Sequence, residues 1–319
     1  MITTDLERAK KVLIQNELIA IPTETVYGIA GNAFSETAIK KIFELKKRPY
    51  FNPLIVHIKS TEYLLEIVES IPLIAQKLAS AFWPGPLTLV LKKNEKIPAS
   101  VTSGKDTVAV RVPNHKLTLD LLQQLDFPLV APSANPFGSI SPTSALHVSN
   151  YFGEKLSVIL DGGICEKGIE STIIGFENEQ PVLYRHGSLS IEEIEKVAGP
   201  LIIRTKENVE PNAPGMLSRH YAPETKTYLT SKLMNMIERF EGKKIGVLVF
   251  KNKVLDSRIS HLEVLSSNGN YEEAASNLYG AMHRLDEFKL DVILAEKLPD
   301  HDLGKTINDR LERASKNKE

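Results

Sequence analysis

Hydroxyl and cationic side chains gather early in the chain, where short apolar runs end. Thr23 and Thr25 lie in the stretch IPTETVYG, and cations occupy positions 46–48 in KKRP. A threonine often stabilises a turn, and a cation at a helix C-terminus complements the helix dipole, so each cluster has a structural explanation. Three consecutive cations are more than the helix dipole requires. Because Arg and Lys also bind phosphates and carboxylates, the pattern indicates an anion site as well.

Further polar groups follow at the ends of later apolar runs. Arg111 lies in TVAVRVP, and since a buried, unpaired Arg is costly, it either faces solvent or meets an anion. The other groups are Ser133, Asn135, Ser139, Ser141 and Thr143 of one Pro/Ser-rich loop, Ser171 and Thr172 of GIESTI, and Arg185. Each alone fits an ordinary turn. Together they provide many donors, several cations and little acid, which predicts a site for an anionic, oxygen-rich ligand.

Familiar catalytic and metal-binding motifs are absent from the sequence. It contains no G-x-x-x-x-G-K-[ST], no G-x-G-x-x-G after a strand, no H-E-x-x-H and no G-x-S-x-G. The single cysteine, Cys165, excludes an internal disulfide and a cysteine-based zinc site. His57, alone on an apolar strand, is more often a satisfied core histidine than a catalytic one. We therefore assign no general acid or base.

Alternating strands and helices must position these groups. Predicted strands cover 17–22, 53–58, 86–93, 107–113, 127–133, 156–163, 243–250 and 291–298, with a hairpin at 171–185. Predicted helices cover 5–16, 35–47, 61–70, 73–83, 115–125, 143–152, 190–199, 271–288 and 304–316. Ser190 and Glu193 form a capping box, and Gly199 ends that helix. The candidate groups fall mostly at strand ends and in the loops that follow them.

Length and composition indicate two α/β domains. The chain has 319 residues, 42% of them hydrophobic, with a formal net charge of -1. We expect one domain at 1–205, a Pro-containing linker at 206–226 and a smaller domain at 227–319. The near-zero net charge argues against a global nucleic-acid-binding field. No apolar run approaches a membrane span and the N-terminus is no signal peptide, so we expect a cytoplasmic protein.

Several ordered motifs resemble one known family. PTETVYG, K-x-R-P at 46–49, NPLIVHI, WPGPLT, VAVRVP and PSAN look like the YrdC-like threonylcarbamoyl-AMP synthases, and APGMLSRHYAP and INDRLERA resemble its two-domain form. The resemblance implies an open, twisted, mixed α/β sheet with helices around a large positively charged cavity, plus a small Rossmann-like α/β domain. It implies that L-threonine, bicarbonate or CO2, and ATP are condensed to L-threonylcarbamoyladenylate and pyrophosphate. Other proteins would then transfer the threonylcarbamoyl group to adenosine next to the anticodon of ANN-decoding tRNAs.

The resemblance also implies site residues. L-Threonine would be bound by Thr25, His57, Arg111, the backbone of Ala131, and Ser171. ATP would be bound by Lys46, Arg48, Asn52, Thr107, Ser133, Asn135, Ser141 and Arg185. Lys46 and Arg48 would stabilise the phosphate charge, and Tyr221 would contact the nucleotide if the linker crosses the cavity mouth. Mg²⁺ would arrive with ATP, because the clusters offer few carboxylates for a protein-built cage.

The linker sequence and the function both leave alternatives open. The linker departs from the family pattern S-P-G-M-K-Y-R-H-Y-A-P at Ala213, Leu217 and Ser218. A non-catalytic module for double-stranded RNA or tRNA is a rival reading, which the low net charge and the lack of clustered cations with aromatics disfavour. An accessory domain of a carbamoyltransferase is a third reading, but the expected cysteine-rich metal modules are missing.

Overall fold

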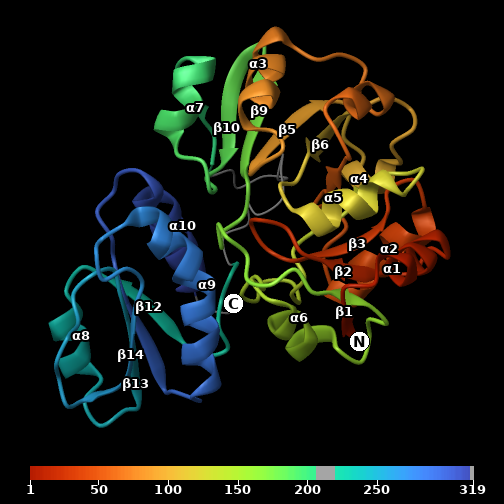
Figure 1. Ribbon diagram of the computed structural model, residues 1–319. Helices are drawn as coiled ribbons and strands as arrows, with labels where there is room; N and C mark the ends of the chain where they lie inside the picture. Colours follow the sequence, from red (N-terminus) through yellow and green to blue (C-terminus); the bar gives the residue numbers. More distant parts are fainter. Residues whose placement is uncertain (206–219, 317–319) are drawn as a thin grey trace.

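The computed structural model describes residues 1–205 and 220–316, which form two lobes, each built on its own sheet (Figure 1). The three family departures at Ala213, Leu217 and Ser218, and most of the predicted linker, lie outside the described residues. The larger lobe holds an 11-stranded sheet in the order β1-β8-β2-β3-β7-β4-β6-β5-β9-β10-β11. Its strands pair in both parallel and antiparallel directions, so the predicted mixed sheet is confirmed.

The strands of the larger lobe are short. They are β1 (Ile2–Thr3), β2 (Ile19–Ile21), β3 (Gly28–Asn32), β4 (Ile55–His57), β5 (Leu87–Lys92), β6 (Thr107–Arg111), β7 (Leu129–Val130), β8 (Ile159–Leu160), β9 (Thr172–Glu177), β10 (Gln180–Arg185) and β11 (Ile202–Ile203). Its helices are α1 (Leu6–Ile14), α2 (Glu36–Lys46), α3 (Leu73–Phe82), α4 (Ala99–Thr102), α5 (Lys116–Gln123), α6 (Ala145–Phe152) and α7 (Ile191–Ala198). The predicted helix at 61–70 is wrong beyond one short 3₁₀ segment, Glu62–Glu66.

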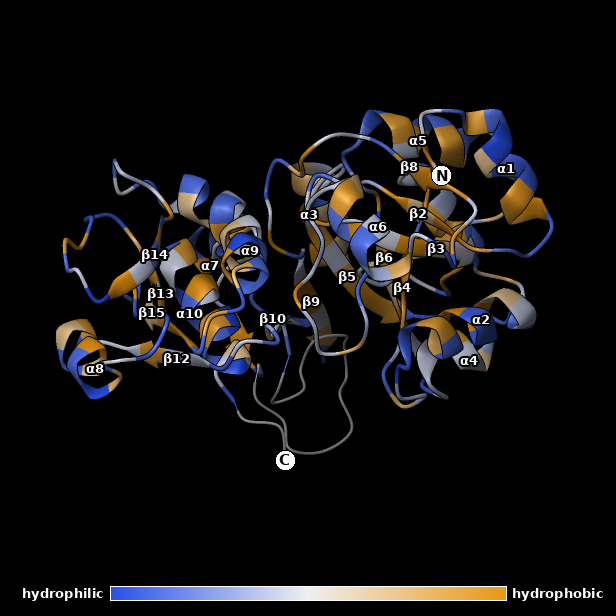
Figure 2. Cartoon of the chain, turned by 90° about the horizontal axis from the view of Figure 1, so that it is seen from below, coloured by the Kyte–Doolittle hydropathy of each residue, from blue (hydrophilic) through white to orange (hydrophobic). Residues whose placement is uncertain are grey.

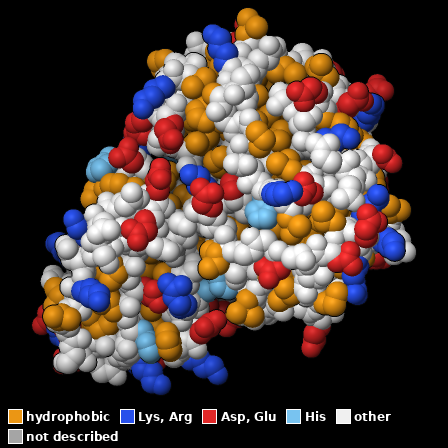
Figure 3. All heavy atoms as spheres, viewed as in Figure 1, with side chains coloured by type: hydrophobic (Ala, Val, Ile, Leu, Met, Phe, Trp, Pro, Cys, Tyr) orange, Lys and Arg blue, Asp and Glu red, His pale blue; other side chains and the backbone are white. Residues whose placement is uncertain are grey.

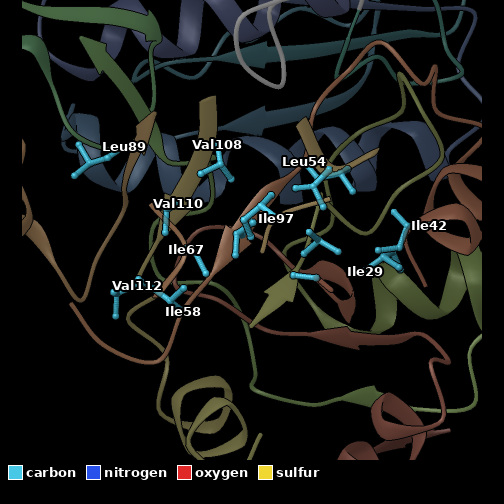
Figure 4. Close-up of a cluster of buried hydrophobic side chains, with 14 of the residues drawn as sticks. Ile29, Ile42, Leu54, Ile58, Ile67, Leu89, Ile97, Val108, Val110 and Val112 are labelled. Carbon is cyan, nitrogen blue, oxygen red and sulfur yellow. The ribbon is translucent and has the colours of Figure 1, made fainter. Parts of the chain in front are cut away.

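Alternation along the strands divides the core between the two faces of this sheet. Val108 and Val110 of β6 enter the largest apolar cluster, whereas Ala109 between them packs on the opposite face with Ile55 of β4. Figure 4 shows Val108, Val110 and Val112 in that largest cluster. Because side chains alternate with a period of two, the residues after Ile55 and Ala109 on the second face are His57 and Arg111. The apolar pattern thus fixes which way these two polar side chains point.

The smaller lobe has a parallel, doubly wound sheet in the order β12-β15-β13-β14. Its elements are β12 (Thr227–Thr230), α8 (Leu233–Arg239), β13 (Ile245–Val249), β14 (Ile259–Val264), α9 (Tyr271–Glu287), β15 (Val292–Glu296) and α10 (Leu303–Ala314). Two apolar clusters occupy the two faces, one under α8 and the other under α9 and α10. The predicted Rossmann-like second domain is therefore confirmed.

Helices α9 and α10 lie on the side of the small lobe that faces the large one (Figures 1 and 2). Thr306 of α10 donates a hydrogen bond to the carbonyl of Gly187 at 3.1 Å, and Lys305 lies 2.7 Å from Glu192 of α7. His283 of α9 stacks on His147 of α6 with ring centroids 3.9 Å apart. Polar and ring contacts, most of them between buried or half-buried side chains, therefore join the lobes.

Helix ends follow the capping rules that the sequence predicts. Ser190 accepts from the backbone of Glu193, whose carboxylate accepts in return from the backbone of Ser190, and Gly199 ends α7. Ser35 caps α2, and Lys47 ends it in the left-handed conformation with φ of 52°. This end of α2 sets the direction of the chain that carries Arg48 toward the sheet.

Candidate functional site

A cavity with about 590 Å³ of empty volume lies among the strand ends of the large lobe. It is lined by Thr23, Thr25, Val26, Tyr27, Gly28, Arg48, Leu54, Ile55, His57, Arg111, Ala131, Pro132, Ser133, Glu170, Ser171, Arg185, His220 and Tyr221. These residues come from six or more loops and strand ends, which the sheet brings together. Polar side chains from distant parts of the sequence therefore share one enclosed space.

Two parallel strands set one wall of this cavity. His57 ends β4 and Arg111 ends β6, and the two residues are register partners. Because the carboxyl ends of neighbouring parallel strands meet at the same edge of a sheet, both side chains reach the cavity. Ala131 lies beside them, with its N–H donating to the carbonyl of Ile55 at 3.1 Å. The wall is therefore fixed by backbone pairing rather than by loop conformation.

Arg111 is held by three polar neighbours. Its Nε donates to the carbonyl of Gly85 at 3.1 Å, and its Nη1 donates to Oγ1 of Thr25 at 2.9 Å. Its Nη2 lies 2.7 Å from Oε2 of Glu24, with both side chains 4% exposed. That ion pair is not aligned as a hydrogen bond, and neither Nη2 nor Oε1 of Glu24 has a hydrogen-bond partner among the described residues. Hydrogen-bonding capacity thus remains at this buried point.

His57 is neutral in this surrounding. Burial, and then the charge of Arg111, lower the pKa of His57 to about 3. Its Nδ1 is buried without a hydrogen-bond partner in the described part of the chain. A buried polar atom without a partner is costly unless a ligand or water satisfies it. Of the two interpretations of His57, a satisfied core histidine or a ligand-facing one, the structure therefore favours the ligand-facing one.

The two threonines of PTET differ in what they do. Thr23 donates to the carbonyl of Val26 at 2.7 Å and accepts from the N–H groups of Thr25 and Val26, so it stabilises the turn. The hydroxyl of Thr25 lies 2.8 Å from that of Thr23 and accepts from Arg111. Both interpretations of this motif therefore apply: Thr23 stabilises the turn, and Thr25 completes the cavity wall that carries Arg111.

A second wall carries Arg48 and Arg185. Arg48 donates from Nε and Nη2 to Asn52 and from Nη2 to the carbonyl of Pro53, at 2.7–3.0 Å. Arg185 ends β10 and donates to the carbonyl and hydroxyl of Ser171. Burial, and then the charge of Arg185, lower the pKa of Arg48 to about 9. The charge of Arg185 therefore acts on Arg48, and two guanidinium groups on one wall form a favourable place for an anion.

Lys46 lies behind this wall instead of lining the cavity. Its side chain is 1% exposed, and its Nζ donates to the carbonyls of Ser133 and Asn135. Burial, and then the charge of Arg48, lower the pKa of Lys46 well below its usual value. In this arrangement Lys46 organises the loop 132–139, from which Ser133 faces the cavity.

The predicted site residues thus divide into two groups. Those that line the cavity are Thr25, Arg48, His57, Arg111, Ala131, Ser133, Ser171, Arg185 and Tyr221. Those that do not are Lys46, Asn52, Thr107, Asn135 and Ser141. Asn52, Asn135 and Ser141 contact lining residues or the loop that bears them. Thr107 begins β6 and pairs with Lys92, at the opposite end of the strand from Arg111.

Two glutamates correct the expectation of little acid at the site. Glu24 and Glu170 are 4% and 6% exposed, and each forms an ion pair with an arginine. Glu24 stands inside PTET and Glu170 inside GIEST, so both lay within motifs that drew attention for their hydroxyls. The sequence places both acids next to hydroxyls, since Glu24 lies between two threonines and Glu170 directly precedes Ser171.

Tyr221 closes the cavity from the side of the small lobe. It is 1% exposed and adopts a φ of 63°, a left-handed conformation that a tyrosine rarely takes. The N–H of Ala222 donates to the carbonyl of Gly138 at 2.9 Å, and His220 packs against the ring of Tyr221. The hydroxyl of Tyr221 is buried with no hydrogen-bond partner in residues 1–205 or 220–316.

The described ranges contain no helix that is long and apolar enough to cross a membrane. They also contain no group of three or more His, Cys, Asp or Glu that could hold a metal ion.

The fold and the cavity define a two-domain α/β protein with an enclosed, polar ligand site. The family described as telomere recombination (Sua5_yciO_yrdC) matches residues 11–187, and the family described as threonylcarbamoyl-AMP synthase, C-terminal domain, matches residues 189–316.

Full-length relatives agree with these matches. A threonylcarbamoyl-AMP synthase of Pyrococcus abyssi is 44% identical over 94% of this chain and 91% of the relative. One of Bacillus subtilis is 38% identical over 97% of this chain and 92% of the relative. The crystal structure of P. abyssi Sua5 complexed with L-threonine superposes with a TM-score of 0.91 and 42% identity, covering 97% of this chain and 94% of that one. The chain therefore belongs to the Sua5–YciO–YrdC family, in its two-domain form.

Proposed function

We propose that this chain is a threonylcarbamoyl-AMP synthase, an enzyme of the nucleotidyltransferase type. It condenses L-threonine, bicarbonate or CO2, and ATP into L-threonylcarbamoyladenylate and pyrophosphate. The observation that carries the proposal is a set of buried polar atoms around the cavity that lack a hydrogen bond among the described residues: His57 Nδ1, Tyr221 OH, and Arg111 Nη2, which has only its ion pair with Glu24. The likeness to P. abyssi Sua5 with L-threonine supports the choice of amino acid.

L-Threonine is assigned to the wall at the ends of β4 and β6. Arg111 binds its carboxylate through Nη2, and Thr25 and His57 contact the rest of the molecule, with Ala131 and Ser171 beside them. A guanidinium suits a carboxylate because it can donate two parallel hydrogen bonds. The neutral state of His57 supports this assignment, since a neutral imidazole adds no second charge beside the ammonium group of threonine.

ATP is assigned to the opposite wall. Arg48 and Arg185 stabilise the phosphate charge, Ser133 contacts the nucleotide, and Tyr221 covers it. Four residues behind this wall support these groups: Lys46, Asn52, Asn135 and Ser141. No contact of Thr107 among the described residues supports its predicted role in ATP binding. Tyr221 also excludes water from an adenylate that water would hydrolyse.

The chemistry needs positioning more than acid–base groups. The ammonium group of threonine first loses a proton to water. The resulting amine takes up CO2 with loss of a second proton, or bicarbonate with loss of water, to give a carbamate. A carbamate oxygen then attacks the α-phosphate of ATP, the bond to the β-phosphate oxygen breaks, and pyrophosphate leaves. Charge builds up on the phosphate oxygens, where fixed cations stabilise the transition state. Mg²⁺ comes with ATP as part of the substrate, since each buried glutamate already pairs with an arginine.

Pyrophosphate release tests the proposal. The purified chain is incubated with Mg-ATP and bicarbonate, together with L-threonine, L-serine or glycine. We expect release with L-threonine and little with the other two amino acids. Release that is absent, or equal for all three, would reject the synthase.

The same purified protein also tests the alternative that the chain binds RNA without catalysis. On the face drawn in Figure 3, Lys and Arg are interspersed with Asp and Glu rather than gathered in one patch. Salt-sensitive tRNA affinity without turnover would favour the binding module. In the proposed pathway the adenylate passes to separate threonylcarbamoyl-transfer proteins that act on tRNA.

A further inference from the structure

Glu170 is the meeting point of the two lobes at the cavity. It lines the cavity, and its Oε1 accepts from the hydroxyl of Ser141 at 2.6 Å. Its other partners come from the small lobe: Nε of Arg310 at 3.0 Å and the hydroxyl of Tyr279 at 2.9 Å, both to Oε2. Burial alone would raise the pKa of Glu170, but Arg310, Arg185 and Ser141 together lower it, so the carboxylate is ionised.

Arg310 carries this contact on to Tyr221. Its side chain is fully buried on α10, and its guanidinium lies over the ring of Tyr221, 4.7 Å from the ring centroid. Its Nη2 donates to the carbonyl of His186, the residue after Arg185. Tyr279 of α9 stacks on the same ring with centroids 5.7 Å apart. Two side chains of the small lobe therefore pack on the ring of Tyr221 and fix its position.

We propose that Arg310 and Tyr279 are positioning residues for the nucleotide wall, which act through Glu170 and Tyr221. This inference rests on the proposed function, because it uses the assignment of ATP to that wall. Neither residue lines the cavity. Each contacts residues that do, and the hydrogen bonds fix Glu170 next to Ser171 and Arg185. The small lobe thus completes the ATP site of the large one, rather than only lying beside it.

Arg111 of the threonine wall has a separate set of contacts, whereas Ser171 is shared by both walls because it accepts from Arg185. Arg111 is held by Glu24, Thr25 and Gly85, all from the large lobe. Among the described residues, no hydrogen bond or ion pair joins this set to Arg310 or Tyr279. Loosening the contacts of the small lobe should therefore weaken ATP binding and leave threonine binding nearly unchanged. A residue that only stabilised the fold would affect both substrates together.

Tyr279→Phe is the mildest test, because it removes the hydroxyl that donates to Glu170 and retains the ring that stacks on Tyr221. We expect the KM for ATP to rise about tenfold, the scale of a lost hydrogen bond to a charged group. Arg310→Lys keeps the charge but loses the planar fork that reaches Glu170 and His186, and should act in the same direction. The dissociation constant of L-threonine, measured by equilibrium dialysis without nucleotide, should stay within about twofold.

Lys305→Met is the matched control. Lys305 also lies on α10 and also forms an ion pair with the large lobe, with Glu192, but it does not line the cavity or contact Glu170. We expect this variant to keep the wild-type KM for ATP. Thermal denaturation of all variants shows which of them are folded.

A double-mutant cycle of Glu170→Gln with Tyr279→Phe tests whether the two act together. Glu170→Gln removes the charge and one of the two acceptor oxygens that bind Ser141, Tyr279 and Arg310. If Tyr279 acts through this carboxylate, Tyr279→Phe should reduce ATP affinity less in the Glu170→Gln background than in the wild type. Binding of a non-hydrolysable ATP analogue reports these effects without turnover, so the inference can be judged even if pyrophosphate release fails. Wild-type ATP affinity in folded Tyr279→Phe and Arg310→Lys would overturn it, as would an equal loss for threonine.

Discussion

At the scale of single residues, the Arg111–Glu24 pair determines how the candidate site holds charge. The two side chains are buried together at 2.7 Å, yet one atom of each remains without a hydrogen bond among the described residues. A buried pair of this kind adds little net stability, because desolvation offsets the attraction, but removing one partner is costly. The pair therefore keeps a cation in place for an incoming carboxylate, which would satisfy Nη2.

Arg111→Ala should both weaken threonine binding and destabilise the fold. The change leaves Glu24 buried without its cation, which costs about 3–5 kcal/mol of unfolding free energy. The double change Arg111→Met with Glu24→Gln removes both charges and should regain most of that stability, while threonine affinity stays lost. Denaturant unfolding and calorimetric titration with L-threonine measure the two effects. If threonine affinity returned with stability, Arg111 would matter only as the partner of Glu24.

The sequence indicated the kinds of residue at the site better than their individual roles. The alternation in VHI and VAVR places His57 and Arg111 on one face, which strand geometry alone predicts. The run KKRP did not show which of its three cations would reach the cavity. Their directions depend on where α2 ends, which the sequence does not fix to the residue. In the structure Lys46 is buried, Lys47 is exposed at the helix end, and Arg48 lines the cavity.

At the scale of elements, the loop 132–139 depends on Lys46. This one ammonium group bonds the carbonyls of Ser133 and Asn135, and the carbonyl of Lys46 accepts from the N–H of Phe137 at 2.9 Å. Buried carbonyls without partners are unfavourable, so the loop conformation and the position of Lys46 are linked. The loop bears Ser133, so a change behind the wall should alter the wall itself.

Lys46→Met should loosen this loop. Two buried carbonyls lose their donor, at a cost of about 1–3 kcal/mol each, so backbone amides in 132–139 should exchange hydrogen faster and the KM for ATP should rise. Lys47→Met removes the same charge from the exposed neighbour and serves as the control. Hydrogen exchange followed by mass spectrometry measures the loop. Lost ATP affinity with unchanged exchange would instead mean that Lys46 binds the phosphates directly.

Strand β3 shows why some elements escaped prediction. Its sequence GIAGN is rich in small residues that favour strands little, yet it is buried in the middle of the sheet. A Cβ on Gly28 would lie 3.1 Å from that of Ala131, and one on Gly31 would lie 2.9 Å from the side chain of Leu18. Close packing of neighbours requires these glycines, and a single sequence does not reveal such neighbours.

At the scale of the whole molecule, histidines at the lobe interface make stability depend on pH. Burial, and then the charge of Arg284, lower the pKa of His147 to about 4. Burial, and then His147, lower the pKa of His283 to about 3. His283 also lies 3.2 Å from the carbonyl of Ser141, so its ring is part of the contact between lobes. Both rings stay neutral in the folded chain at pH values where free histidine is protonated.

Stability should therefore fall as the pH drops below about 6.5. Between that value and the folded pKa, the unfolded state binds a proton that the folded state does not, so each such histidine lowers the unfolding free energy by about 1.4 kcal/mol per pH unit. Above pH 6.5 the contribution is fully present. Replacing His283 by Gln should reduce the slope between pH 6.5 and 5 by one histidine, as measured by denaturant unfolding. An unchanged slope would show that His283 does not titrate in this way.

The division into two α/β sheets followed from strand and helix patterns along the chain, because each sheet is built from one continuous part of the chain. What composition could not show is how the lobes meet. Arg310 and Glu170 are 140 residues apart, and nothing local in INDRLERA distinguishes Arg310 from the exposed arginines of an ordinary helix. Its role became visible only from its burial and its partners.

The central claim is that the cavity joins a carbon from bicarbonate to threonine before adenylation. The most direct measurement is mass spectrometry of the product formed from ¹³C-bicarbonate, L-threonine and ATP. The account predicts an adenylate that contains threonine and one additional carbon, and that carries the ¹³C label. A threonyl adenylate without the added carbon, or an adenylate whose mass is the same with labelled and unlabelled bicarbonate, would contradict it.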